Sequence, residues 1–184
     1  GVAPDIVPPE GGITRVTYGY INGAGRYYKG ADFQTGARFL TDEAGDFFVN
    51  LSIAYVDDER RSDTPGDPYV TIMEQERRLR SRSYLSFSWT KNDWAAGVST
   101  SRIGSMNYQS PRWDGKPNTK IDPYYDIGAF VRYDIEDGHY VALSVSNLMD
   151  DVPKKNSDLG WPWFATYYYS PVGRELFLTY RYTF

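Results

Sequence analysis

The chain of 184 residues contains no cysteine, which excludes disulfide bonds and any metal site built on thiolates. The formal net charge is −4 and no stripe of Lys or Arg is present, which argues against a nucleic-acid partner. No run approaches the ~18–20 consecutive apolar residues that a transmembrane helix requires. The chain has a single histidine, so histidine-based catalysis has one possible source.

Aromatic residues, in contrast, are abundant: the chain contains 5 Trp, 17 Tyr and 9 Phe. A β-sandwich could use them in its core. A membrane barrel could use them in girdles at its two interfaces, and its strands need only alternating apolar residues.

A regular alternation of apolar and polar residues lies between Val172 and Phe184. One face carries Leu176, Leu178, Tyr180, Tyr182 and Phe184, and the other carries Glu175, Thr179, Arg181 and Thr183, with Phe177 as the exception. A period of two residues predicts a β-strand with an apolar and a polar face. The apolar face continues to the terminal Phe184, an ending that resembles the closing strand of bacterial outer-membrane β-barrels.

The same alternation predicts strands over residues 26–40, 46–55, 80–90, 94–103, 124–135 and 139–147, and a weaker one over residues 13–21. Residues 1–12 are rich in Pro and Gly and predict a loop. Strands of about ten residues match a tilted membrane span better than the usual strand of 5–6 residues.

The connections between these strands alternate in length. Those at 41–45, 91–93 and 136–138 are short, and those at 56–79, 104–123 and 148–171 are long. In an up-and-down antiparallel sheet, all short turns lie at one end and all long loops at the other. Outer-membrane barrels have this asymmetry, and long structureless loops are uncommon in soluble sandwiches. The sequence therefore predicts an all-β, antiparallel, up-and-down transmembrane β-barrel, to which the chain supplies seven or eight strands.

Three segments resemble TonB-dependent outer-membrane receptors. The run VSNLMDD at 145–151 is similar to the penultimate strand and turn of that family, with Asn147, Leu148 and Asp150 in place and Met149 where Phe is usual. Residues 22–39, which contain Gly30-Ala31-Asp32, and residues 171–184 resemble two further strands of these receptors.

The resemblance implies a barrel of 22 strands around an N-terminal plug, in the outer membrane of a Gram-negative bacterium. It also implies import of a scarce nutrient (an iron–siderophore, cobalamin or a carbohydrate) driven by TonB, without a cofactor. The expected partners are outer-membrane lipid, lipopolysaccharide, the barrel assembly machinery, and the plug and earlier strands of the receptor. Residues 1–184 would then be its C-terminal part, with the plug and earlier strands supplied by a separate chain or by further sequence. Tyr182 and Phe184 would form the barrel-assembly signal.

Candidate ligand-binding residues lie in two predicted extracellular loops. Residues 159–173 carry no charge and contain Trp161, Trp163, Tyr167, Tyr168 and Tyr169, which could stack on sugar rings or on a siderophore. Packing within the loop, or an interfacial belt, is the alternative use of these rings. Arg112 and Trp113 form a second, weaker candidate.

Other chemistry has less support. His139 follows the short Glu136-Asp137-Gly138 turn, away from the long loops, so we expect an interface residue and no enzyme. The acidic residues at 57–59, 63 and 67 lack the spacing of an EF-hand, and we expect a solvated loop and no metal site. The arginines at 77, 78, 80 and 82 could contact lipopolysaccharide phosphates or form a plain charged rim.

Two other architectures fit parts of the pattern. The first is a complete barrel of eight strands, serving as an adhesin or structural protein, which needs residues 13–21 as a full strand. The second is a soluble, aromatic-rich, lectin-like sandwich, which should remain soluble without detergent.

Overall fold

The computed structural model describes residues 25–73, 78–108, 119–155, 163–166 and 168–183, together with Arg15, Gly19 and Trp161. The predicted loop at 1–12 lies outside these residues, as does nearly all of the weak strand predicted at 13–21. The described part of the chain is all-β, and its single helical element is the 3₁₀ turn Glu136–Gly138. It contains no helix that is long and apolar enough to cross a membrane.

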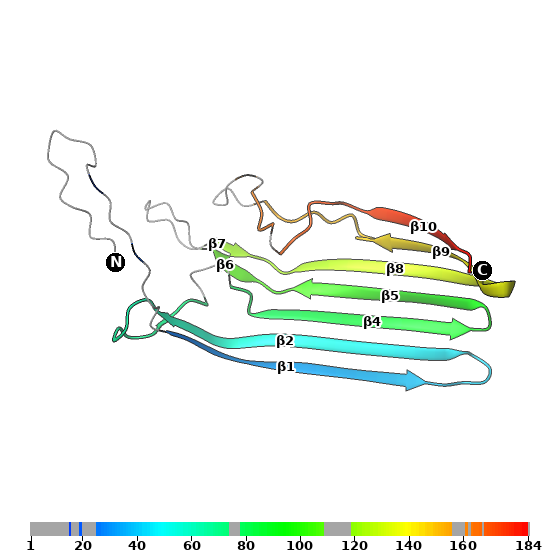
Figure 1. Ribbon diagram of the computed structural model, residues 1–184, viewed down its shortest axis with the longest axis horizontal. Coiled ribbons are helices and arrows are strands. Elements are labelled where there is room, and N and C mark those ends of the chain that lie inside the picture. The colour runs from blue at the N-terminus through cyan, green and yellow to red at the C-terminus, as the bar shows by residue number, and fades with distance from the viewer. Residues whose placement is uncertain are drawn as a thin grey trace.

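Seven long strands form one antiparallel sheet in chain order (Figure 1). They are β1 (Gly25–Phe39), β2 (Asp46–Ser62), β4 (Ser81–Lys91), β5 (Trp94–Ile103), β8 (Tyr124–Ile135), β9 (His139–Ser146) and β10 (Glu175–Arg181). The short strand β3 (Val70–Thr71) pairs with β2, and β6 (Met106–Tyr108) pairs with β7 (Thr119–Ile121) in a separate two-stranded sheet. The prediction of an all-β, up-and-down antiparallel sheet of seven or eight strands is confirmed.

Two segments predicted as loops contain strands. β2 continues to Ser62, seven residues beyond the predicted end, because it pairs with the first residues of β1. Its charged side chains form ion pairs there, Lys29 Nζ to Asp57 Oδ2 at 2.6 Å and Arg60 to Asp58 at 2.6 Å. The predicted loop at 104–123 contains the hairpin strands β6 and β7.

The strand register gives the sheet one apolar face that runs from β1 to β10. Residues paired directly across neighbouring strands share a face. One such row is Ala37, Val49, Phe87, Val98, Ala129, Val145 and Leu176, in the order of the strands. We call this surface the apolar face. The opposite surface, the polar face, includes Gln34, Ser52, Tyr84, Ser101 and Asp126, likewise paired in register.

Aromatic side chains concentrate on the apolar face near the short turns. They are Phe39, Phe47, Trp89, Trp94, Tyr133 and Tyr180. The rings of Trp94 and Tyr133 lie 4.8 Å apart between centroids. These six residues thus form a row across the sheet at one edge of the apolar face.

The long strands lie in a single layer, and nothing in the described part of the chain covers the apolar face (Figure 1). Leu176 and Leu178 of β10, for example, are 69% and 77% exposed. The described buried apolar residues lie outside the long strands, at the end of the sheet where the long loops meet: Ile72, Met73, Met106, Ile121, Ala165 and Tyr169. The sheet is open, with β1 at one edge and β10 at the other.

Candidate functional site

A cavity of about 380 Å³ lies on the polar face at the loop end of the sheet. Its floor comes from the ends of four neighbouring strands, and residues 168–173 cover it. The lining residues are Ser101, Ile103, Tyr124, Asp126, Ser146, Asn147, Tyr168, Tyr169, Ser170, Val172, Gly173 and Glu175. We call this hollow the loop-end cavity.

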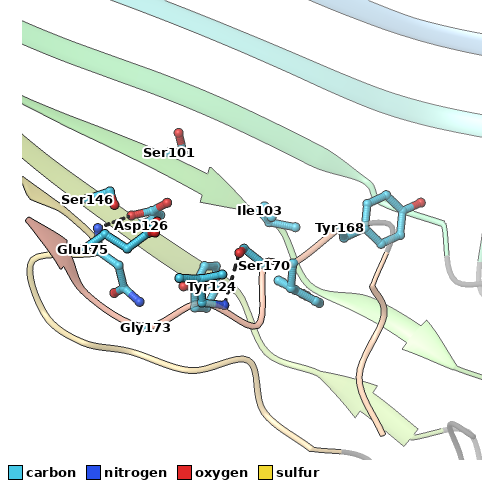
Figure 2. A pocket seen from close by; sticks show the side chains of 12 residues that line it. Ser101, Ile103, Tyr124, Asp126, Ser146, Tyr168, Ser170, Gly173 and Glu175 are labelled. Atoms are coloured by element: carbon cyan, nitrogen blue, oxygen red, sulfur yellow. Dashed lines mark hydrogen bonds between the residues drawn. The ribbon is translucent and has the colours of Figure 1, made fainter. Parts of the chain in front are cut away.

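Strand register brings the polar lining residues together. Ser101 of β5 pairs with Asp126 of β8, and Ser146 of β9 pairs with Glu175 of β10. Figure 2 shows Asp126, Ser146 and Glu175 gathered at one end of the cavity, with Tyr168 at the other. Four strands separated in sequence thus contribute to one small polar surface.

The Asn147 side chain closes the turn that follows β9. Asn147 is buried and has a φ of 47°, a left-handed conformation that asparagine adopts more readily than most residues. Its Nδ2 donates to the Asp151 carbonyl at 2.7 Å, and its Oδ1 accepts from the Asp151 N–H at 2.9 Å. Its own N–H donates to Asp126 Oδ1 at 3.1 Å, which fixes a carboxylate of the cavity.

Asp150 joins the same turn to the start of β10. Its Oδ1 accepts a hydrogen bond from the Arg174 N–H at 2.8 Å, next to Gly173 in the cavity wall. Asn147 and Asp150 therefore hold the strand ends on which the cavity is built.

A cluster of apolar side chains holds the cover of the cavity in place. Tyr169 packs with Met106, Ile121 and Ala165, and its ring meets Tyr124 edge-on at 5.4 Å between centroids. Tyr168 is half-buried, and the Arg82 guanidinium lies over its ring at 5.3 Å.

The predicted aromatic residues take different places. Tyr168 and Tyr169 line the cavity, whereas Trp161 is 82% exposed and Trp163 lies 5.9 Å from the Lys155 ammonium, both outside the lining. Tyr167, Arg112, Trp113 and Phe184 lie outside the described residues. Tyr182, at the opposite end of the sheet, packs against His139 at 4.1 Å between ring centroids.

The sequence patterns did not single out Asp126, Ser146 or Glu175. Ser146 and Glu175 are terminal residues of their strands, and Asp126 lies two positions from the start of β8, in each case at the end that faces a long loop. The sequence could have shown this position near a strand end, but only the strand register shows which of these polar residues lie together in one site.

Four acidic residues of the 56–79 segment, Asp57, Asp58, Glu59 and Asp63, form ion pairs with basic side chains. Besides the pairs of Asp57 and Asp58, Glu59 contacts Arg26, and Asp63 lies 2.6 Å from Arg61. Glu59 also lies 3.7 Å from Arg78, while Arg77 is outside the described residues. No group of three or more acidic or histidine side chains is placed to hold a metal ion in the described part of the chain.

Two further hollows continue the loop-end cavity along the polar face. One, of about 520 Å³, shares Ser146 with it and is lined by Ser86, Ser88, Ser99 and Ser144 among others. The other, of about 340 Å³, shares Ser101, Ile103 and Tyr168. The polar face is thus a hydroxyl-rich surface with adjoining hollows.

Comparison of the chain with protein-family models, curated proteins and solved structures finds no match. In the part of the chain that the structure describes, fold and site define an open, single-layer all-β sheet. No described residue covers its apolar face, and its polar face has a cavity at the loop end.

Proposed function

We propose that the chain forms part of the wall of an outer-membrane β-barrel that acts as a TonB-dependent nutrient receptor. The apolar face contacts lipid, and the polar face lines the lumen. The observation that carries the proposal is the strand register, which joins seven alternating strands into one continuous apolar face.

Solvation energetics support a lipid environment for this face. Leaving a Leu, Val or Phe side chain in water instead of an apolar environment costs about 1.5–3 kcal/mol. The apolar face repeats this cost over seven strands, and a bilayer removes it without a second protein layer. The open edges of the sheet fit a place in the wall of a larger barrel. Backbone N–H and C=O groups in lipid must be paired, and further strands joined to β1 and β10 would pair those at the two edges.

Receptor function is supported by the site at the loop end. The loop-end cavity opens on the face proposed to line the lumen, and the Asn147 and Asp150 turn that shapes it carries the resemblance to the receptor family. The ligand binds there from the extracellular side, and a plug coupled to TonB gates its passage to the periplasm. The mechanism is binding and gated import, without a covalent step.

Neighbouring residues of β9 provide a matched test of the lipid-facing assignment. Leu143 lies on the apolar face, and Ser144 on the polar face beside the 520 Å³ hollow. Because an arginine near the middle of a bilayer costs about 2–4 kcal/mol, Leu143→Arg should strongly reduce insertion into liposomes, measured as protection from trypsin. Ser144→Arg should insert nearly as well as the parent protein.

Equal effects of the two substitutions, or a folded protein that stays in solution without detergent, would contradict the membrane assignment. Import is tested in cells with and without TonB. We expect loss of TonB to abolish uptake while surface binding remains, whereas TonB-independent uptake would contradict the receptor assignment.

A further inference from the structure

We infer that the loop-end cavity binds an uncharged, polyhydroxylated ligand, the chemistry of a saccharide, and discriminates against anions. The inference rests on the proposed function, because it names the class of ligand that the receptor takes. It is drawn from the charge, hydroxyl groups and aromatic rings of the cavity lining.

The charge of the lining is negative. Asp126 and Glu175 both line the cavity, and no Lys or Arg is among the described residues that do so. The nearby Arg82 guanidinium lies over the Tyr168 ring and lines the adjoining 340 Å³ hollow, and Tyr168 is at the opposite end of the cavity from Asp126 and Glu175 (Figure 2). An anionic ligand at the end of the cavity that holds Asp126 and Glu175 would be repelled by both carboxylates.

The two carboxylates are suited to accept hydrogen bonds from hydroxyl groups. Asp126 Oδ1 already accepts from the Asn147 N–H, which orients the carboxylate. A carboxylate has about four lone-pair positions, so Asp126 retains capacity for ligand hydroxyls. Hydrogen bonds to an ionised acceptor are roughly twice as strong as neutral ones.

The serine side chains add groups that both donate and accept. Ser101, Ser146 and Ser170 lie around the cavity, and the Ser170 hydroxyl accepts a hydrogen bond from the Val172 N–H at 3.2 Å (Figure 2). A ligand with many hydroxyls can match such groups in either role, whereas a ligand with acceptors alone cannot satisfy the carboxylates.

Tyrosine rings supply the apolar part of the lining. Tyr124, Tyr168 and Tyr169 belong to it, and the edge-on contact between Tyr124 and Tyr169 fixes two of these rings. The C–H groups of a sugar ring are apolar, so they pack on aromatic side chains while the hydroxyls reach the polar groups. A volume of about 380 Å³ is within the usual range of small-molecule pockets.

The experiment removes the charge of the cavity and measures binding of neutral and anionic probes. The double variant Asp126→Asn, Glu175→Gln keeps side-chain size, and the amide oxygen introduced at position 126 can still accept from the Asn147 N–H. The probes are a panel of neutral gluco-, manno-, galacto- and xylo-oligosaccharides, and ferric citrate as the anion. Binding to the assembled barrel that contains this chain, purified in detergent micelles, is followed by calorimetry. The control is Asp32→Asn, which removes one carboxylate of the polar face in β1, outside the cavity lining.

We expect at least one oligosaccharide to bind the parent protein and to bind the double variant at least tenfold more weakly, with Asp32→Asn unchanged. Ferric citrate should bind the parent poorly and the double variant better. Tight binding of ferric citrate to the parent, or no binding of any oligosaccharide, would overturn the inference.

The same preparations are tested for trypsin protection in liposomes. Protection without saccharide binding refutes the ligand class and leaves the membrane assignment standing. Absence of protection of the parent barrel, assembled with its further strands, refutes the proposed function itself. The double variant must also remain protected, so that weaker binding is not caused by misfolding.

Discussion

At the scale of the residue, Asn147 has two structural roles that one small side chain can combine. It occupies a left-handed conformation, and its amide bonds both the N–H and the C=O of Asp151. Its backbone N–H orients Asp126. Few other side chains tolerate this φ while offering a donor and an acceptor so close to the backbone.

This pairing of roles predicts an order of stability among substitutions. Asn147→Ala loses the side-chain hydrogen bonds and keeps a β-carbon at positive φ, so the free energy of unfolding should fall by about 1–3 kcal/mol. Asn147→Gly loses the same bonds but adopts this φ without strain, so its free energy of unfolding should fall by less than that of Asn147→Ala. Denaturant unfolding in micelles measures both, with the exposed Asn50→Ala as the control.

Asp122 gives a prediction for pH. The hydrogen bond from Lys154 Nζ at 2.7 Å, together with the charge of that ammonium, lowers the pKa of the Asp122 carboxyl below its ordinary value of 3.8. A carboxyl whose pKa is lower in the folded state than in the unfolded state stabilises the folded protein at pH values above the unfolded-state pKa. This stabilisation is lost as the pH falls through the folded-state pKa.

NMR titration of the Asp122 carboxyl should therefore give a midpoint below that of an ordinary aspartate. Lys154→Gln should move the midpoint upward, and added salt should do the same in the parent, since both side chains are exposed. A midpoint unaffected by Lys154→Gln would show that this ammonium is not the cause.

At the scale of the element, the pairing of β5 with β8 depends on a glycine that lies under a phenylalanine ring. Gly97 pairs with Phe130 on the polar face, and a β-carbon added to Gly97 would lie 2.5 Å from the Phe130 ring and 3.0 Å from the Phe87 carbonyl. The ring thus occupies the space that a side chain at 97 would take, an arrangement that also covers the glycine backbone.

Gly97→Ala should accordingly destabilise the sheet by about 1–3 kcal/mol through overpacking. Gly128→Ala is the matched control on the same face, where the nearest atoms would lie at 3.3 and 3.4 Å and need to shift only slightly. The added cost of Gly97→Ala should be smaller in a Phe130→Ala background, as a double-mutant cycle in denaturant would measure. Equal costs for the two glycines would contradict this account.

The strands differ in how well the sequence alone predicts them. β5 and β8 have the predicted bounds, 94–103 and 124–135, because alternation is a local property of each strand. The predicted end of β2 was wrong because Asp57, Asp58 and Arg60 resemble a loop in composition. Their pairing with β1, and that of Arg60 with β3, makes them part of the strand. The loop-end cavity could not be predicted, because Ser101 and Asp126 are neighbours only through strand register.

At the scale of the whole molecule, the described apolar residues are placed differently from those of a typical small soluble protein, in which the apolar face of a sheet is buried. The described apolar core is a small cluster at the loop end, while the apolar face of the sheet is left uncovered by the described residues. Hydrophobic burial within the described residues therefore holds the loop-end cavity together, whereas the long strands depend on their ladder of hydrogen bonds and, in the proposed setting, on lipid.

The order of the strands has a consequence for how such a wall can close. Seven antiparallel strands is an odd number, so β1 and β10 point the same way along the sheet. Joining these edges directly would create a parallel seam, and so would joining β10 of one copy to β1 of a second copy in the same orientation. A cylinder that is antiparallel throughout requires an odd number of strands inserted between the two edges. Strand parity therefore makes the total even, whatever the final diameter of the barrel.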